Sequence, residues 1–439
     1  MKSQYSRILA LLVAIGIFAS ACAPKTSEPT NAPVTEATKA PVAAEKAVLT
    51  VAHYYPGGDP SEAPMEAIFD EFRQANPDID LVVQQNPLDQ YSTILDTAFL
   101  AGKEPDLAFF MGFHVPDRLK GGMIVPIEDY IYEWLPDIDW YEEAIQNQTR
   151  IGNGVLACFP FQGNTWPMFY NMKVLNDSGV AEIPTTTAEL IDAAQKVRAA
   201  GYKPWVVGGN DWTGSHVIAF MLESRIGYEK AVDMFANGGF AADADARSAI
   251  ETFVQLRDAG VFVDNVEGLV AMDMEQAFFS DTAAMMSSGS WVMTNIPDSV
   301  AEHVTLGGLP IMPGSPYDRP TTWLDTGGLA FCLTRNGANN LDAAKRFVQF
   351  FYTEAHMASL VEAASITVPF PVTLDESKLG PVFKQSLTLS EKYQTFLFTD
   401  PMIPASVARG FDMAAAQAFQ PGTSVDTILQ ALDAAYQNK

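Results

Sequence analysis

The sequence predicts a mixed α/β fold with enough apolar residues for two domains. After residue 47, short apolar strands alternate with amphipathic helices, which is the pattern of sheets covered by helices. Hydrophobic residues make up 48% and aromatic residues 11% of the 439 residues, which is ample for two cores. Beyond the N-terminus, no hydrophobic run is long enough to span a membrane.

The first predicted elements are a strand, a helix and a second strand. Val48–His53 is the first strand, and Tyr54–Gly58 is the loop that follows it. A helix after Pro64 is predicted because apolar residues recur at i, i+3, i+4 and i+7. These residues are Met65, Ile68, Phe69 and Phe72. Asn76–Pro77 ends this helix, and Ile79–Val83 is the next strand.

Later segments continue the alternation. Leu107–Phe110 is the third strand, and loops at such strand ends are where open α/β sheets bind ligands. Thr186 and Glu189 predict a capping box at a helix start. The inner face of that helix is predicted to be Leu190, Ile191, Ala194 and Val197, and its end Gly201. A late helix is predicted to pack Leu341, Ala344, Phe347, Val348 and Phe351 on one side.

The N-terminus has the features of an export signal. Lys2 and Arg7 precede the apolar run Ile8–Phe18, which is too short to remain in a bilayer. Ala19–Ala21 supplies small residues for cleavage before Cys22. We therefore expect residues 1–21 to be a signal peptide.

Cys22 is predicted to be a lipidation site that anchors the protein to the outer face of a cell membrane. The segment resembles a bacterial lipobox, although Ala19 stands where leucine is usual. Simple secretion after the same triplet stays open, and export follows in both cases. Residues 22–47 contain no aromatic residue and many Pro, Thr, Ala, Lys and Glu, so we expect a disordered tether.

The net charge limits the kinds of molecule that the protein can bind, and the two remaining cysteines raise the question of a disulfide. The net charge of −26 argues against nucleic acid and anionic membrane surfaces as partners, since both need basic patches. It is compatible with cationic ligands such as polyamines. Cys158 and Cys332 both lie in apolar segments that resemble buried strands; they either pair or stay as buried free thiols.

Motifs for catalysis are weak. The five histidines are far apart in the sequence, so no metal site is predicted. The sequence contains neither a dinucleotide-binding fingerprint nor a phosphate-binding loop, so no cofactor is predicted. Asp177–Gly179 and Asp325–Gly327 spell the triplet of aspartic proteases, but the first ends a predicted helix with Gly179 as its C-cap. A glycosidase would need two facing carboxylates, for which Asp59, Asp211 and Asp325 are the candidates.

Several segments together resemble the family of bacterial extracellular solute-binding proteins, group one, which includes the maltose-binding type. They are Met168–Lys173, similar to the family's aromatic-Tyr-Asn strand and turn; Pro184–Leu190, similar to its helix start; Ala283–Trp291, similar to its A-A-M-x-x-x-G-x-W segment; and Leu341–Phe347, similar to a helix after an Asn-rich turn. The resemblance covers nearly the whole chain after residue 47.

The resemblance implies a two-lobed fold of the periplasmic-binding-protein type II class. Each lobe is a mixed sheet flanked by helices, and the ligand lies in the cleft between the lobes. The implied lobes are 48–161 with 322–362, and 162–321 with 363–439. Such a protein is a monomer that closes by hinge motion, catalyses no reaction and delivers its ligand to the permease subunits of an ABC importer.

A sugar ligand is expected to stack on aromatic rings and to bond with amides, carboxylates and hydroxyls. The candidate ligand-binding residues lie in the loops at strand ends and lobe crossings. They are Tyr54, Tyr55, Asp59, Phe113, His114, Gln162, Asn164, Trp166, Asp211, Trp212, Trp291, Trp323 and Asp325. Trp134, Trp140 and Trp205, which have Leu, Ile or Val nearby, are interpreted as structural.

Other functions remain open at this stage. Within the same class, the ligand is alternatively a polyamine or a glycerol phosphate, although basic residues are scarce in the predicted cleft, where Arg118 and Arg409 are the only candidates. A secreted hydrolase is a second class, and a surface adhesin a third.

Overall fold

The computed structural model describes residues 46–55, 58–325 and 327–437. These residues belong to one compact unit that begins at Lys46. The predicted signal peptide, Cys22 and nearly all of the predicted tether lie outside the described residues. None of the helices within them is long and apolar enough to cross a membrane.

The described chain forms strands in three sheets. The strands are β1 (Ala47–His53), β2 (Ile79–Gln85), β3 (Leu107–Met111), β4 (Phe159–Gln162), β5 (Thr165–Trp166), β6 (Met168–Asn171), β7 (Lys203–Val206), β8 (Ala283–Ser287), β9 (Val304–Gly307), β10 (Thr321–Leu324), β11 (Leu329–Leu333) and β12 (Gln394–Phe396). Their orders are β2-β1-β3-β11-β4, β7-β8-β6-β9 and β12-β10-β5.

Helices cover these sheets. The α-helices are α1 (Glu62–Ala75), α2 (Leu88–Leu100), α3 (Val115–Lys120), α4 (Glu128–Trp134), α5 (Glu142–Ile151), α6 (Met172–Asp177), α7 (Thr187–Ala199), α8 (Trp212–Ile226), α9 (Tyr228–Asn237), α10 (Ala244–Asp258), α11 (Ala271–Phe279), α12 (Asp298–Ala301), α13 (Leu341–Phe351), α14 (Glu354–Ala364), α15 (Pro381–Ser386), α16 (Leu389–Lys392), α17 (Ala405–Phe419) and α18 (Val425–Ala434).

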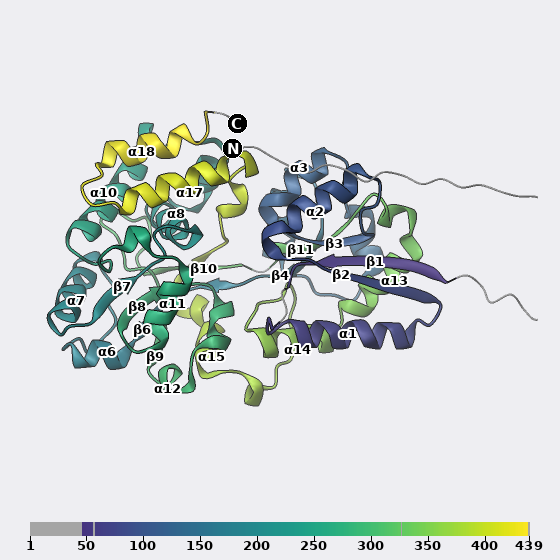
Figure 1. The fold of residues 1–439 in the computed structure, drawn as a ribbon, viewed down its shortest axis with the longest axis horizontal. Coiled ribbons are helices and arrows are strands. Elements are labelled where there is room, and N and C mark those ends of the chain that lie inside the picture. Colours follow the sequence, from purple (N-terminus) through teal and green to yellow (C-terminus); the bar gives the residue numbers. More distant parts are fainter. Residues whose placement is uncertain (1–45, 56–57, 326, 438–439) are drawn as a thin grey trace, which may run out of the picture. The chain divides into compact units, whose positions relative to one another are not determined.

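The first sheet combines distant parts of the chain. β1 pairs in parallel with β2 and β3, and β11 is inserted antiparallel between β3 and β4. Helices α1 and α14 lie on one side of this sheet and α2 and α3 on the other (Figure 1). The core between them is rich in aromatic rings; Phe109, for example, lies edge-on to Phe161 and Phe331.

The second sheet is formed by residues between the two crossings of the chain. β7 and β8 are parallel, whereas β6 is antiparallel to both β8 and β9. Helices α8, α10, α17 and α18 pack against one another beside this sheet (Figure 1). The small third sheet joins β5 and β10, which belong to the crossings, with β12. The predicted lobe boundaries stay a prediction.

Most of the predicted elements are confirmed. α1 buries all four predicted apolar residues, and α7 begins with the predicted capping box of Thr186 and Glu189. The first strand begins at Ala47, one residue earlier than predicted. Two details were wrong: Ile191 is only half-buried, whereas Ala193 is buried on the inner face, and Leu341, the first residue of α13, is exposed.

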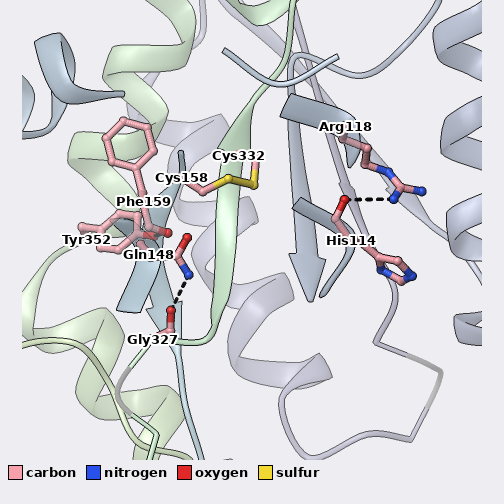
Figure 2. The surroundings of a disulfide bond; sticks show 8 residues. All are labelled: His114, Arg118, Gln148, Cys158, Phe159, Gly327, Cys332 and Tyr352. Atoms are coloured by element: carbon pink, nitrogen blue, oxygen red, sulfur yellow. Dashed lines mark hydrogen bonds between the residues drawn. A yellow bond between two sulfur atoms is a disulfide. The ribbon is translucent and has the colours of Figure 1, made fainter. Parts of the chain in front are cut away.

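The open question of the two cysteines is resolved by strand pairing. Phe331 of β11 lies opposite Phe159 of β4, so Cys332 lies opposite Cys158, and their Cα atoms are 4.4 Å apart. That separation suits a cross-strand bridge. The two residues form a disulfide bond, and both are fully buried (Figure 2).

Candidate functional site

The parallel strands β7 and β8 place two tryptophans at one edge of the second sheet. The carboxyl ends of parallel neighbours meet at the same edge, which is where open α/β sheets bind ligands. After β7 the chain turns into α8, whose first residue is Trp212, and after β8 it continues to Trp291 in the 3-10 helix Ser290–Asn295. The two ring centroids are 6.0 Å apart, with the ring planes tilted by 44°.

The conformation of Trp291 depends on Gly289. The indole of Trp291 folds back over this glycine, and a Cβ atom added there would lie 2.0 Å from the ring. Only glycine allows so close an approach of a ring to the backbone. The glycine of the G-x-W segment therefore has a steric role.

Trp166, in the crossing strand β5, has its ring next to those of Trp212 and Trp291 and of Trp323 in the other crossing strand. Its ring centroid lies 5.8 Å from that of Trp212, 5.6 Å from that of Trp291 and 6.0 Å from that of Trp323, each in an edge-on arrangement. Its indole N–H donates a hydrogen bond of 2.7 Å to Ser287 Oγ at the end of β8. Four of the predicted residues are thus brought together from four separate segments.

Trp323 is held in the cluster by strand pairing and by a buried hydrogen bond. It lies opposite Trp166 in the pairing of β10 with β5, and its side chain is fully buried. Its indole N–H donates a hydrogen bond of 2.7 Å to Glu223 Oε2 on α8. Because both groups are buried, this bond orients the ring, and Trp323 supports the cluster from within.

Two further aromatic residues of this cluster were missed in the sequence. His216 lies one helical turn after Trp212, and its ring centroid is 4.5 Å from that of Trp166. Phe398 lies 4.9 Å from Trp323 between ring centroids. The i, i+4 spacing from Trp212 was a signal for His216, whereas no local pattern indicated Phe398.

The cluster is open to solvent on one side. Trp212 has 40% of its surface exposed, and Trp291 is partly exposed, whereas Trp166 and Trp323 are fully buried. Large rings held in place by buried neighbours and open on one side form a rigid surface for stacking.

Asp211 has a structural role at this edge. Its Oδ1 accepts hydrogen bonds from the Thr213 N–H at 2.9 Å and the Thr213 hydroxyl at 2.7 Å, which caps α8. Its Oδ2 accepts the Ala271 N–H at 2.6 Å, where α11 begins. Both oxygens therefore already have protein partners, and a ligand contact by Asp211 stays a prediction.

The candidates in the crossing segments are buried and lie together. The Asp325 N–H donates to the Asn164 carbonyl oxygen at 2.8 Å, and the Asp325 carboxylate accepts from Asn147 Nδ2 at 3.1 Å and from the Gly328 N–H. The Asp325 carboxylate is thus bonded to the residue just before β11. Gln162, at the end of β4, accepts a hydrogen bond from the Tyr55 hydroxyl.

Tyr54 and Tyr55 belong to the core of the first sheet. Their ring centroids lie 5.0 Å and 5.4 Å from that of Phe109, and both side chains are buried. Burial raises the pKa of each phenol well above its usual value. Packing is therefore their observed role, and contact with a ligand stays a prediction.

The remaining candidates lie at loop ends of the first sheet. Asp59 accepts the Ser61 N–H at 2.7 Å and so fixes the turn before α1. Phe113 and His114 have ring centroids 4.2 Å apart. His114 lines a cavity of about 310 Å³ with Asp96 and Arg118, and burial, followed by the positive charge of Arg118, lowers the pKa of His114 to about 4.

In the described part of the chain, no group of three His, Cys, Asp or Glu side chains is placed to hold a metal ion. The ligand-binding role of each candidate stays a prediction. The geometry singles out the tryptophan cluster as the group with an exposed, rigid aromatic surface.

Comparisons with known proteins agree with this architecture. The family model of bacterial extracellular solute-binding proteins matches residues 57–358. The alpha-glucosides-binding periplasmic protein AglE of Rhizobium meliloti (strain 1021) is 23% identical over 388 residues, which cover 82% of this chain and 81% of that protein.

Solved structures show the same fold. A probable secreted solute-binding lipoprotein from Streptomyces coelicolor is 29% identical, with a TM-score of 0.80, over 89% of this chain and 98% of that chain. A chitin oligosaccharide binding protein has a TM-score of 0.77 at 19% identity, over 90% of this chain and 99% of that chain. The predicted two-lobed α/β fold class is thereby confirmed. Because the family consists of substrate-binding proteins, the hydrolase alternative is not retained, and the chain belongs to the family of bacterial extracellular solute-binding proteins.

Proposed function

We propose that this protein binds a carbohydrate, either a monosaccharide or an oligosaccharide, in the cleft between its lobes. The observation that supports this most is the cluster of Trp166, Trp212, Trp291 and Trp323, with Trp212 exposed at its open side. The flat C–H faces of pyranose rings stack on indoles, and the surrounding amides and carboxylates suit sugar hydroxyls.

The names of the relatives point in the same direction. AglE is described as binding alpha-glucosides and the second structural neighbour as binding chitin oligosaccharides, so both are sugar binders. The shared class of ligand supports a sugar for this chain, without identifying which one.

Binding proceeds in this proposal by hinge closure. The crossings that include Gln162–Trp166 and Thr321–Asp325 form the hinge, and the ligand stabilises the closed arrangement because it touches both lobes. The lobes are 48–161 with 322–362, and 162–321 with 363–439. The thirteen candidate residues supply the contacts.

Transport completes the proposal. The closed, monomeric protein hands the sugar to the permease subunits of an ABC importer. A lipid on Cys22 holds it at the outer face of the membrane, and residues 22–47 act as the tether.

Thermal unfolding with a panel of ligands tests this proposal, because a ligand of the folded state raises the midpoint by mass action. The panel contains maltose, raffinose, diacetylchitobiose, spermidine and glycerol 3-phosphate. We expect a sugar to raise the midpoint, and we expect Trp212→Ala and Trp291→Ala to weaken its binding at least about tenfold.

Matched variants separate stacking from general damage. Trp212→Phe keeps a flat ring and should retain part of the affinity. Tyr132→Ala removes an aromatic side chain that is 59% exposed on α4, outside the cluster, and should bind as the unmodified protein does. A response to spermidine or glycerol 3-phosphate with none to sugars would overturn the carbohydrate assignment.

A further inference from the structure

Two hydroxyl groups beside the tryptophan cluster are buried without a hydrogen-bond partner. Thr165 is 1% exposed and Ser288 is 0% exposed. Neither Thr165 Oγ1 nor Ser288 Oγ has a partner among the described residues. Such groups are uncommon, because a buried hydroxyl loses its hydrogen bonds to water and nearly always gains a replacement.

Both hydroxyls belong to segments that lie against each other. Thr165 precedes Trp166 in β5, and its backbone N–H donates to Ser290 Oγ at 3.4 Å. Ser288 follows Ser287, whose hydroxyl accepts the Trp166 indole N–H at 2.7 Å. The two orphan hydroxyls are therefore attached to the backbone segments that position Trp166 and Trp291.

Three nearby hydroxyls do have partners, so each of the two has a bonded neighbour of its own residue type. The hydroxyls of Ser287 and Ser290 accept the bonds just described, and Thr322 donates to the Trp166 carbonyl oxygen at 3.0 Å. The side-chain oxygen of Asn164, next to Thr165, also has no partner within the described residues.

We propose that Thr165, Ser288 and the side-chain oxygen of Asn164 form the polar half of the ligand site and bond with the hydroxyls of an uncharged sugar. This inference rests on the proposed function, for which it specifies the ligand chemistry. A serine or threonine hydroxyl both donates and accepts, and an amide oxygen accepts, so the set matches sugar hydroxyls.

The same set matches charged ligands poorly. A polyamine needs carboxylates to balance its charge, and a phosphate needs basic donors. The three oxygens offer neither. All three residues are buried. In this proposal the sugar reaches them when the hinge opens and covers them again when it closes.

The test compares each orphan hydroxyl with a bonded neighbour of the same residue type. The variants are Ser288→Ala against Ser287→Ala, and Thr165→Val against Thr322→Val, each made in the otherwise unchanged protein. Two quantities are measured: the urea midpoint without ligand, and the dissociation constant for the sugar of the panel that binds best, by calorimetry.

We expect Ser288→Ala and Thr165→Val to leave the ligand-free urea midpoint unchanged or higher, because no internal bond is lost, and to weaken sugar binding about three- to tenfold. Ser287→Ala and Thr322→Val should lower the urea midpoint, because each leaves a buried partner group unsatisfied. A singly deoxygenated sugar should bind the unmodified protein more weakly, but should bind the matching variant as tightly as the parent sugar does.

Several outcomes would overturn the inference while the proposed function stands. One is normal sugar affinity in both variants. Another is a lowered urea midpoint for Ser288→Ala with normal affinity, which would mean that ordered water satisfies the hydroxyl. If the unmodified protein itself binds no sugar, the proposed function and this inference fail together.

Discussion

Asp211 ties the starts of two helices together through a hydrogen bond of 2.6 Å from the Ala271 N–H to Asp211 Oδ2. Its other oxygen caps α8, whose first residue is Trp212. A carboxylate at a helix N-terminus is favoured by the helix dipole as well as by the hydrogen bonds. Asp211 therefore sets the position of the exposed tryptophan relative to α11.

Replacing Asp211 should reduce the stability of the fold. Asp211→Ala removes the acceptor of the Thr213 N–H in α8 and of the Ala271 N–H in α11, so we expect the free energy of unfolding to fall by about 2 kcal/mol. Asp211→Asn keeps one acceptor oxygen and should lose about half as much. Urea unfolding measures both values, and equal losses in the two variants would contradict the double-cap interpretation.

The bond between Trp323 and Glu223 gives a second prediction. Trp323→Phe removes the indole N–H that donates to the buried Glu223 carboxylate at 2.7 Å, and we expect a loss of about 1–3 kcal/mol in unfolding free energy. The matched control is Trp205→Phe, because Trp205 is also buried but its indole N–H has no partner in the described residues. Similar losses in the two variants would assign the effect to ring volume rather than to the bond.

The disulfide gives a prediction about stability alone. It links residues 174 positions apart, so it restricts the unfolded chain strongly, and loop-closure entropy predicts a contribution of about 5 kcal/mol. In the double variant Cys158→Ala with Cys332→Ala, the free energy of unfolding measured with urea should be lower by about this amount. Adding reductant to the folded native protein should have little effect, because both cysteines are buried. Rapid reduction of the native protein would contradict the buried placement.

The buried His53 predicts loss of stability in acid. Burial lowers the pKa of His53 from 6.5 to about 4, and its ring lies 5.9 Å from those of Tyr55 and Phe69. The unfolded chain therefore binds the proton more readily than the folded chain. Titration of His53 therefore costs the folded state nothing above about pH 6.5. As the pH falls from 6.5 to about 4, it lowers the free energy of unfolding by an amount on the order of 3 kcal/mol.

Replacing the ring tests this assignment. His53→Phe should flatten the dependence of unfolding free energy on pH between about 4 and 6.5. His114, whose pKa is also lowered to about 4, should account for a further part, which the double variant with His114→Phe would remove. An unchanged slope in His53→Phe would show that this imidazole does not titrate as the structure implies.

Local features of the chain predicted the fold elements well. The apolar spacing in Met65–Phe72 and the pair Thr186 and Glu189 each act over one or two helical turns, so the sequence alone identified α1 and the start of α7. The misplacement of Ile191 and Leu341 has a physical cause: how far a residue on a helix flank is covered depends on the neighbouring element, which no local pattern describes.

The sequence by itself determined the α/β class and the places where strands end and loops with aromatic residues begin, because these depend on interactions between near neighbours in the chain. Only the tertiary structure decided that Cys158 and Cys332 pair, that Tyr54 and Tyr55 lie in the core, and that four tryptophans gather with His216 and Phe398. These outcomes depend on contacts between distant segments, and burial follows from which faces of those segments meet.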